Sequence, residues 1–140
     1  LAKQLSDAGA DLIIGSGPHM AGEAAQVDQS LVIYSIGNGV FNSNGEYQER
    51  DMPAYGFIVR LFVGGRQPHI QLLPIFTDNK KTFWQPRPVN KTEFSALLTH
   101  LIQQGMPVIR EGETGTGWRA LTSNNECMLT MPLSECFGES

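Results

Sequence analysis

The sequence has few cationic side chains, no long hydrophobic run and only two cysteines. It holds 10 lysines and arginines against 14 acidic residues, which gives a formal net charge of -4. Binding to nucleic-acid phosphates depends on clustered lysine and arginine, so this balance argues against nucleic acid as a partner. No apolar stretch approaches the roughly 18 residues that a membrane-spanning helix needs, which argues against a transmembrane segment.

The two cysteines, Cys127 and Cys136, are too far apart for a redox C-x-x-C pair. Two alternatives stay open for them. A disulfide would stabilise the end of the chain by a few kcal/mol and would imply an oxidising compartment. The other alternative is a pair of free, buried thiols.

The 140 residues fit one domain, and a hydrophobic content of 41% is typical of a globular chain. The helical spacing of Leu1, Leu5 and Ala8 predicts a helix that stops at Gly9 and leads into a strand at residues 10–14. Because the first residues already resemble the second half of a helix, we expect the chain to be a portion of a longer protein.

Continuous and alternating apolar runs predict several strands. The run at residues 31–35 predicts a strand covered on both faces, as in sheets flanked by helices. Residues 55–63 and 68–76, joined by a loop that contains glycine, predict an antiparallel hairpin. Pro74 in the second arm indicates an edge strand or a bulge.

Residues 90–105 give the clearest helix signal. Asn90 can cap the helix, Glu93 completes a capping-box pattern, and Gly105 can end it. The predicted apolar stripe consists of Phe94, Leu97, Leu98, Leu101 and Ile102. Beyond it, residues 107–140 are rich in glycine, threonine and serine without a clear period, and we expect an irregular extension there.

The glycines of residues 15–22 raise the question of a phosphate-binding loop. The dinucleotide pattern G-x-G-x-x-G fails at Met20, and a P-loop would need lysine where the chain has Glu23. Pro18 also removes one of the backbone N–H donors that such a loop uses. A phosphate- or nucleotide-binding domain therefore stays only a remote alternative.

His19 lies in the loop that follows the first strand, at the strand end where α/β proteins commonly place their ligands. His69 and His100 have no ligand-like spacing to it, and a metal ion needs three or more protein ligands. Location alone makes His19 a candidate site residue, with an ordinary structural histidine as the alternative.

Three stretches together resemble the carboxyl-terminal half of the bacterial capsule-synthesis CapA family. They are GADLIIGSGPH at residues 9–19, LVIYSIGNGVFN at residues 31–42 and the hairpin with its continuation to residue 79. This family is linked to poly-γ-glutamate capsules and has a calcineurin-like metallophosphoesterase fold. The resemblance covers residues 1–90 and rests on the order and spacing of the three stretches.

The resemblance implies an α/β fold that is part of a four-layer metallophosphoesterase-like sandwich. Residues 1–106 would be the carboxyl-terminal part of that domain, and residues 107–140 the irregular extension. It also implies a divalent metal cofactor (manganese, iron or zinc), an anionic polymer or phosphoester substrate, a membrane synthase complex as partner and an extracytoplasmic or envelope location.

Two residues carry the family's site pattern. His19 matches the last histidine of the family's H-P-H, which implies a catalytic residue and metal ligand, and Asn38 matches the asparagine of its S-L-G-N, which implies a polar orienting group in the catalytic site. Gly17 and Ser16 stand where the family has histidines. Since Pro18 biases residue 17 toward extended geometry, residues 17 and 19 would face the same side, and a two-metal site would lack one imidazole.

Two functions follow from this reading. The first is a metal-dependent hydrolase of capsule or poly-γ-glutamate biosynthesis with an incomplete or degenerate site. The alternative is a non-catalytic accessory or binding module of a polymer synthesis and export complex. For an acidic chain to hold a polyanion, basic residues such as Arg60, Arg66 and Arg87 would have to gather locally.

Overall fold

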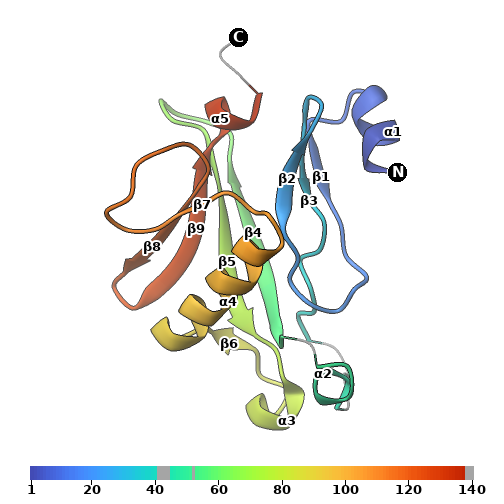
Figure 1. Cartoon of the computed structure of the whole chain (residues 1–140), viewed down its shortest axis with the longest axis vertical. Helices are drawn as coiled ribbons and strands as arrows, with labels where there is room; N and C mark the ends of the chain where they lie inside the picture. Colours follow the sequence, from blue (N-terminus) through green and yellow to red (C-terminus); the bar gives the residue numbers. More distant parts are fainter. Residues whose placement is uncertain (41–44, 52, 138–140) are drawn as a thin grey trace.

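The computed structural model describes residues 1–40, 45–51 and 53–137, and it has the expected α/β class (Figure 1). The helices are α1 (Ala2–Asp7), α2 (Glu46–Glu49), α3 (Asn79–Thr82), α4 (Lys91–Gln103) and α5 (Leu133–Phe137). The strands are β1 (Leu12–Ile14), β2 (Ala24–Val27), β3 (Ser30–Ile33), β4 (Tyr55–Phe62), β5 (His69–Phe76), β6 (Arg87–Pro88), β7 (Val108–Ile109), β8 (Trp118–Ser123) and β9 (Glu126–Pro132). Within these residues, every helix is too short or too polar to cross a bilayer.

The smaller sheet has three strands in the order β1-β3-β2. β1 runs parallel to β3, and β2 returns antiparallel along its other edge. All four residues of β3 are buried, because the strand is central and both of its faces are covered. The expected buried strand is therefore confirmed, as is the helix stop at Gly9, whose φ of 94° favours glycine.

The larger sheet contains six strands, with β4-β5-β9-β8-β7 in order and β6 paired to β5. β4 and β5 form the expected antiparallel hairpin along their whole length. The register sets Ile70 beside Met131 and Leu72 beside Leu129, and these side chains are buried. This face of the sheet therefore forms the main part of the core.

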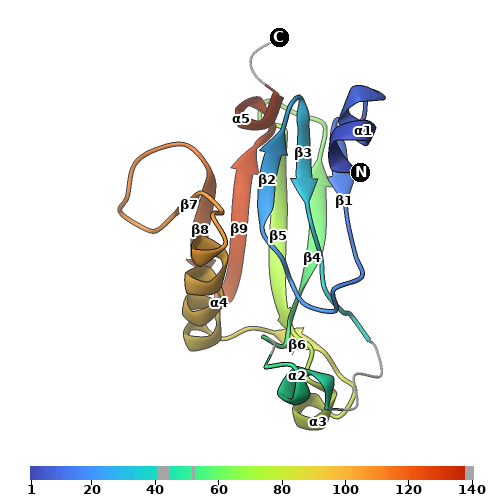
Figure 2. The same cartoon turned by 45° about the vertical axis from the view of Figure 1, so that its right-hand side comes forward.

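The two sheets lie face to face, as Figures 1 and 2 show. Leu31 and Ile33 of β3 belong to the same apolar cluster as the buried residues of the larger sheet. α4 lies beside the smaller sheet and packs its own apolar side chains into that cluster, whereas α1 covers the outer face of the smaller sheet (Figure 2). The layers are therefore, in order, α1, the smaller sheet and the larger sheet, and α4 lies beside the smaller sheet.

The expected irregular extension is wrong where residues 107–137 are described. β8 and β9 pair with each other, and β9 pairs with β5 inside the larger sheet. Asn124 and Asn125 both have positive φ, 49° and 62°, the geometry of a two-residue hairpin turn. The assignment of a domain boundary at residue 106 stays a prediction, and residues 138–140 lie outside the described chain.

Pro74 does not lie on an edge strand, because β5 is flanked by β4 on one side and by β9 and β6 on the other. β9 pairs with residues 69–72 of β5, and β6 pairs with residues 75–76. Pro74 falls in the gap between these two partners. Proline lacks an N–H group, so an interrupted edge is where an internal strand tolerates it.

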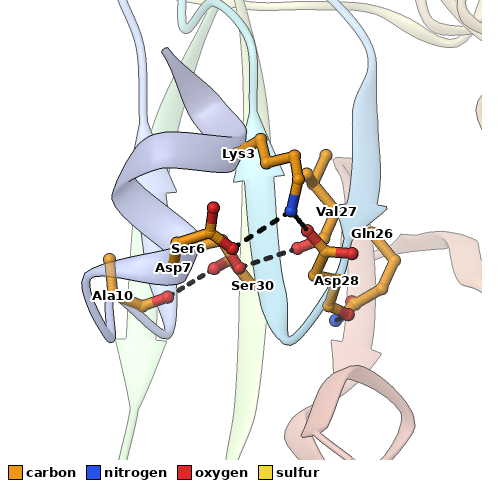
Figure 3. A network of polar contacts seen from close by, with 8 residues as sticks. All are labelled: Lys3, Ser6, Asp7, Ala10, Gln26, Val27, Asp28 and Ser30. Carbon is orange, nitrogen blue, oxygen red and sulfur yellow. Dashed lines mark hydrogen bonds and ion pairs between the residues drawn. The ribbon is translucent and has the colours of Figure 1, made fainter.

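Two buried hydroxyl groups attach α1 and its exit loop to the smaller sheet (Figure 3). The Ser6 hydroxyl donates to the Val27 carbonyl oxygen over 3.1 Å, and the Ser30 hydroxyl donates to the Ala10 carbonyl oxygen. Both serines are buried, so their hydroxyl groups need these acceptors. Buried hydrogen bonds between α1, its exit loop and the smaller sheet therefore set the position of the helix.

An exposed ion-pair network lies above these contacts (Figure 3). The Lys3 ammonium lies 3.1 Å from a carboxylate oxygen of Asp7 and 3.1 Å from one of Asp28. Hydrogen bonds to Asp7 and Asp28 raise the pKa of Lys3. Because all three side chains are solvent-exposed, screening keeps this network a minor contributor to stability.

The capped helix is confirmed as α4. The Asn90 side chain accepts from the Glu93 backbone N–H over 2.8 Å, and the Glu93 carboxylate accepts from the Asn90 backbone N–H over 2.9 Å. Four residues of the predicted stripe are buried, namely Phe94, Leu97, Leu98 and Leu101. Ile102 is the exception, since 39% of its surface is exposed at the margin of the stripe.

Cys127 and Cys136 are free, buried thiols in the structure, which is the second of the two alternatives left open by the sequence. The Cys127 sulfur accepts from the Thr122 hydroxyl, and the Cys136 thiol donates to the Pro132 carbonyl oxygen. Burial raises the pKa of Cys136 to about 11, with a smaller contribution from Glu135. A thiol with this pKa is a weak nucleophile at neutral pH.

Glu93 supports a pH-dependent prediction. Its carboxylate accepts two bonds from Arg87, over 2.8 and 2.9 Å, and these bonds together with the Asn90 N–H lower the pKa of Glu93 from its ordinary value of 4.5. The stabilisation is therefore complete above pH 4.5 and is lost as the pH falls through the lowered pKa. We expect Glu93→Gln to reduce the free energy of unfolding by up to about 1 kcal/mol at pH 7.

Urea denaturation at a series of pH values measures this difference. The gap between the natural chain and Glu93→Gln should close in acid, whereas Glu111→Gln, an exposed position in the loop after β7, should show no comparable gap. A gap that persists unchanged below pH 3 would contradict the ionic origin of the effect.

Candidate functional site

His19 lies in the loop that leaves the carboxyl end of β1, and Asn38 lies just past the carboxyl end of β3. Because β1 and β3 are parallel, these two ends meet at one edge of the smaller sheet. The backbone extends the pairing past the strands, with Gly15 N–H donating to Ile33 and Ile36 N–H donating to Gly15. The two residues predicted from sequence are thus brought together.

The His19 ring and the Asn38 side chain are in direct contact. His19 Nδ1 lies 2.9 Å from Asn38 Oδ1. His19 itself has a φ of 66°, an uncommon left-handed conformation for a residue with a side chain. The strained backbone therefore lies at the residue whose ring contacts Asn38. Strained residues cluster at functional sites, which makes His19 a stronger candidate.

Behind Asn38, three further hydrogen bonds lead into the protein. Asn38 Nδ2 donates to the Tyr47 hydroxyl over 2.8 Å, and that hydroxyl lies 2.9 Å from the Thr77 hydroxyl. The Thr77 hydroxyl donates to the Ala54 carbonyl oxygen over 3.2 Å. Asn38, Tyr47 and Thr77 are all buried, so these bonds form without competition from solvent.

The direction of each bond fixes the protonation of the histidine ring. Thr77 gives its proton to Ala54, so the single hydroxyl proton of Tyr47 goes either to the Thr77 oxygen or to the His19 carbonyl oxygen. In both cases the Tyr47 oxygen accepts from Asn38 Nδ2. Asn38 therefore presents its Oδ1 to His19, and a carbonyl oxygen can only accept. Neutral His19 must carry its proton on Nδ1, which makes Nε2 the acceptor nitrogen of the ring.

We refer to His19, Asn38, Tyr47 and Thr77 as the histidine network. It joins four separate segments, because Tyr47 comes from α2 and Thr77 follows β5. The Tyr47 hydroxyl also lies 3.3 Å from the His19 carbonyl oxygen, the alternative acceptor for its one proton, so the loop backbone lies against the same hydroxyl group. The network thus connects the smaller sheet to the larger one.

Next to Thr77, a buried carboxylate holds the two short helices together. Asp78 accepts from Gln48 Nε2 of α2 over 2.7 Å and from the Lys80 backbone N–H of α3 over 3.1 Å. Lys81 lies 3.9 Å from the same carboxyl group. This arrangement fixes α2, and hence Tyr47, against the end of β5.

Two glycines allow the Asn38 loop to cross β4 at close range. A Cβ at Gly37 would lie 2.8 Å from the Ala21 nitrogen and from the Tyr55 carbonyl oxygen, and a Cβ at Gly56 would overlap the Asn38 carbonyl oxygen. Neither position has room for a side chain, and Gly37 also has a φ of 69°. The placement of Asn38 therefore depends on these glycines.

The geometry expected for residues 17 and 19 is wrong. Gly17 has a φ of 139° instead of the extended conformation that Pro18 was expected to favour, and this value is strained for any residue with a side chain. Space is not the obstacle, since a Cβ at Gly17 would meet nothing within 4 Å. The loop has a backbone suited to glycine where the family pattern has histidine.

The donor set does not amount to a metal centre. Among residues 1–40, 45–51 and 53–137, no group of three or more histidine, cysteine, aspartate or glutamate side chains could hold a metal ion. His69 lies on β5 and His100 on α4, apart from His19, as the sequence indicated. Asn38 uses both of its side-chain groups inside the histidine network. His19 could supply one ligand, through Nε2.

Sequence reasoning missed Tyr47 and Thr77. Thr77 falls inside the third stretch of the family resemblance but had no assigned role, and Tyr47 stands in a short polar helix without a motif. The one usable signal was that Asn38, if buried, needs hydrogen-bond partners for both its side-chain oxygen and its side-chain nitrogen. That requirement predicts polar partners but does not identify them. Phe41 and Asn42, the last residues of the second stretch, lie outside the described chain.

Comparison with known families supports the expected resemblance. Residues 1–43 match the family described as bacterial capsule synthesis protein PGA_cap. The matched segment includes both His19 and Asn38, and the CapA resemblance is confirmed there. No curated protein matches the chain.

The histidine network predicts a tautomer that can be measured. In long-range ¹H–¹⁵N spectra of the neutral ring, His19 should show a protonated Nδ1 and an unprotonated Nε2. Tyr47→Phe removes the acceptor of Asn38 Nδ2, so the amide can turn over, and we expect the Nε2–H tautomer of His19 to appear. The lost hydrogen bonds should also lower the free energy of unfolding by roughly 1–3 kcal/mol.

Tyr34→Phe is the matched control, because Tyr34 is 43% exposed and directly follows β3, outside the histidine network. His69 provides an internal reference, since its Nδ1 donates to the Gln67 carbonyl oxygen and neither substitution changes either residue. A His19 ring that already carries its proton on Nε2 in the natural chain would contradict the derived direction of the network.

Proposed function

We propose that this chain acts in bacterial capsule synthesis as the carboxyl-terminal part of a CapA-like protein, and that His19 is the reactive side chain it contributes. The family match over residues 1–43 supports the link to capsule synthesis. The observation that carries the role of His19 is the histidine network, which holds the ring in one tautomer at the end of two parallel strands.

The proposed reaction is hydrolysis of a phosphoester, or of an amide in poly-γ-glutamate. In the tautomer that Asn38 imposes, Nε2 of His19 carries a lone pair and can accept a proton or bind a Lewis acid. Asn38 is a positioning residue in this scheme. Both of its polar groups are engaged by the protein, so it acts through the histidine ring.

A divalent ion such as manganese, iron or zinc could take part in this reaction only if residues other than those described here supplied further ligands. A catalytic zinc takes about three protein ligands, whereas the described residues hold no group of three or more histidine, cysteine, aspartate or glutamate side chains that could bind an ion. The residues described here therefore do not fit a complete metal centre. What the chain itself supplies is an oriented imidazole and the buried bonds that hold it.

The conformation of Gly17 favours a second candidate function. A φ of 139° at this position leaves no easy place for the second histidine of the family pattern. The second proposal is a non-catalytic accessory module that binds an anionic polymer or a membrane synthase complex. Under either proposal, the family resemblance favours an extracytoplasmic or envelope location.

Metal content and phosphodiester hydrolysis in the intact natural protein distinguish the two candidates. The hydrolase proposal predicts stoichiometric manganese by mass spectrometry and hydrolysis of bis(p-nitrophenyl) phosphate with added Mn²⁺. His19→Ala should remove the metal and reduce the rate by roughly 100-fold or more, because the loss of a positioned proton acceptor or ligand has effects of that size.

His100→Ala makes the same substitution on α4, away from the histidine network, and should leave both measurements unchanged. If no metal binds under any supplementation and no hydrolysis occurs, the hydrolase proposal is wrong and the accessory function stands. Metal that survives in His19→Ala would overturn the assignment of His19 as a ligand.

A further inference from the structure

A cavity lies on the face of the larger sheet that points away from the core. It has a volume of about 520 Å³, within the range typical of pockets for small molecules. The cavity is lined by Arg66, Gln67, Pro68, His69, Arg119, Thr130, Pro132 and Ser134. His69 pairs with Pro132 and Arg119 pairs with Thr130, which places these side chains opposite the buried face of β5, β8 and β9.

This cavity is at the other end of the molecule from the histidine network. The turn between β4 and β5 lies near α5, whereas α2 and α3 lie at the opposite end of the sheets (Figure 1). Arg66 and Gln67 come from that turn, and Ser134 comes from α5. The cavity is therefore a feature independent of His19.

The charge of the lining is unusual for an acidic chain. Two arginines line the cavity, and none of its lining residues is acidic among those described. Arg50, Arg60 and Arg87 each pair with a carboxylate, so they do not gather as a basic cluster. By contrast, Arg66 and Arg119 have no carboxylate partner within the described chain.

The guanidinium groups keep donors for a ligand. Arg119 uses one nitrogen, Nη2, to donate to the Gly115 carbonyl oxygen over 3.1 Å, and a guanidinium has five N–H donors in all. Arg66 makes no hydrogen bond with the described residues. Two guanidinium groups without a carboxylate partner beside one cavity are suited to an oxyanion, which they can bind through paired N–H donors.

The remaining walls combine a rigid imidazole with apolar surface. His69 Nδ1 donates to the Gln67 carbonyl oxygen over 2.9 Å, and the His69 ring stacks on Phe62 with 4.4 Å between ring centroids. Pro68 and Pro132 add apolar walls of fixed shape. A ligand that fits this lining has one anionic group on a small apolar body.

We propose that this cavity binds a small organic anion, a phosphate or carboxylate group on an apolar body, which Arg66 and Arg119 hold through charge-assisted hydrogen bonds. The site is separate from the proposed reaction at His19 and does not depend on it. Phosphate and carboxylate share the recognition chemistry, namely oxygen acceptors with negative charge, so the test uses one probe of each kind.

Phenyl phosphate and benzoate are suitable probes, because they carry the same ring and differ in the anionic group. Titration of the chain at low ionic strength, followed by backbone amide shifts, should perturb residues around the turn between β4 and β5 and around α5. Arg119→Gln and Arg66→Gln should each weaken the affinity by roughly tenfold, since each removes a charge-assisted bond. Stronger binding of one probe identifies the anionic group preferred.

Arg110→Gln is the matched control, because it removes the same charge at a position that does not line the cavity. It should change the affinity by less than about twofold, as expected for a screened charge at a distance. Arg66 lies exposed in a turn, so its variant tests binding without a challenge to folding. Failure of both probes to bind up to about 20 mM, or equal weakening by Arg110→Gln, would overturn the proposal.

Discussion

The parallel pairing of β1 with β3 is the constraint on which the candidate site depends. Its register, from Leu12 beside Leu31 to Ile14 beside Ile33, makes both strands end at the same edge. The loops that carry His19 and Asn38 both start there, although the two residues are 19 positions apart in sequence. In the order β1-β3-β2 no other strand separates β1 from β3, so the loops that follow these two strands begin side by side.

The histidine network also holds the two sheets together. From His19 its bonds pass through Asn38 and Tyr47 to Thr77, which follows the last residue of β5. Because the internal members are buried, the loss of any one leaves a partner without its hydrogen bond. The same buried hydrogen bonds therefore orient the His19 ring and connect the two sheets. A change that disrupts the contact between the sheets at this point would also release the ring.

Local patterns were sufficient for the α/β class, the buried strand β3, the hairpin and the capping box of α4, since each depends on residues close in sequence. The strand-end rule and the family resemblance singled out His19 and Asn38, whose side chains are in contact, and their roles stay predictions. β8 and β9 were missed because Leu121 and Met128 lie on the outer face of the sheet and disguise the alternation of their buried neighbours. Tyr47 and Thr77 meet through tertiary structure alone, and no periodicity or spacing encodes that contact.

The backbone at Gly17 limits which residues the loop can accept at this position. Glycine adopts a φ of 139° at little cost, whereas an L residue there would be strained in the folded state. The substitution Gly17→His would therefore reduce stability before it supplied a usable ligand. The loop would have to change its backbone first, so a second histidine cannot be added at this position by substitution alone.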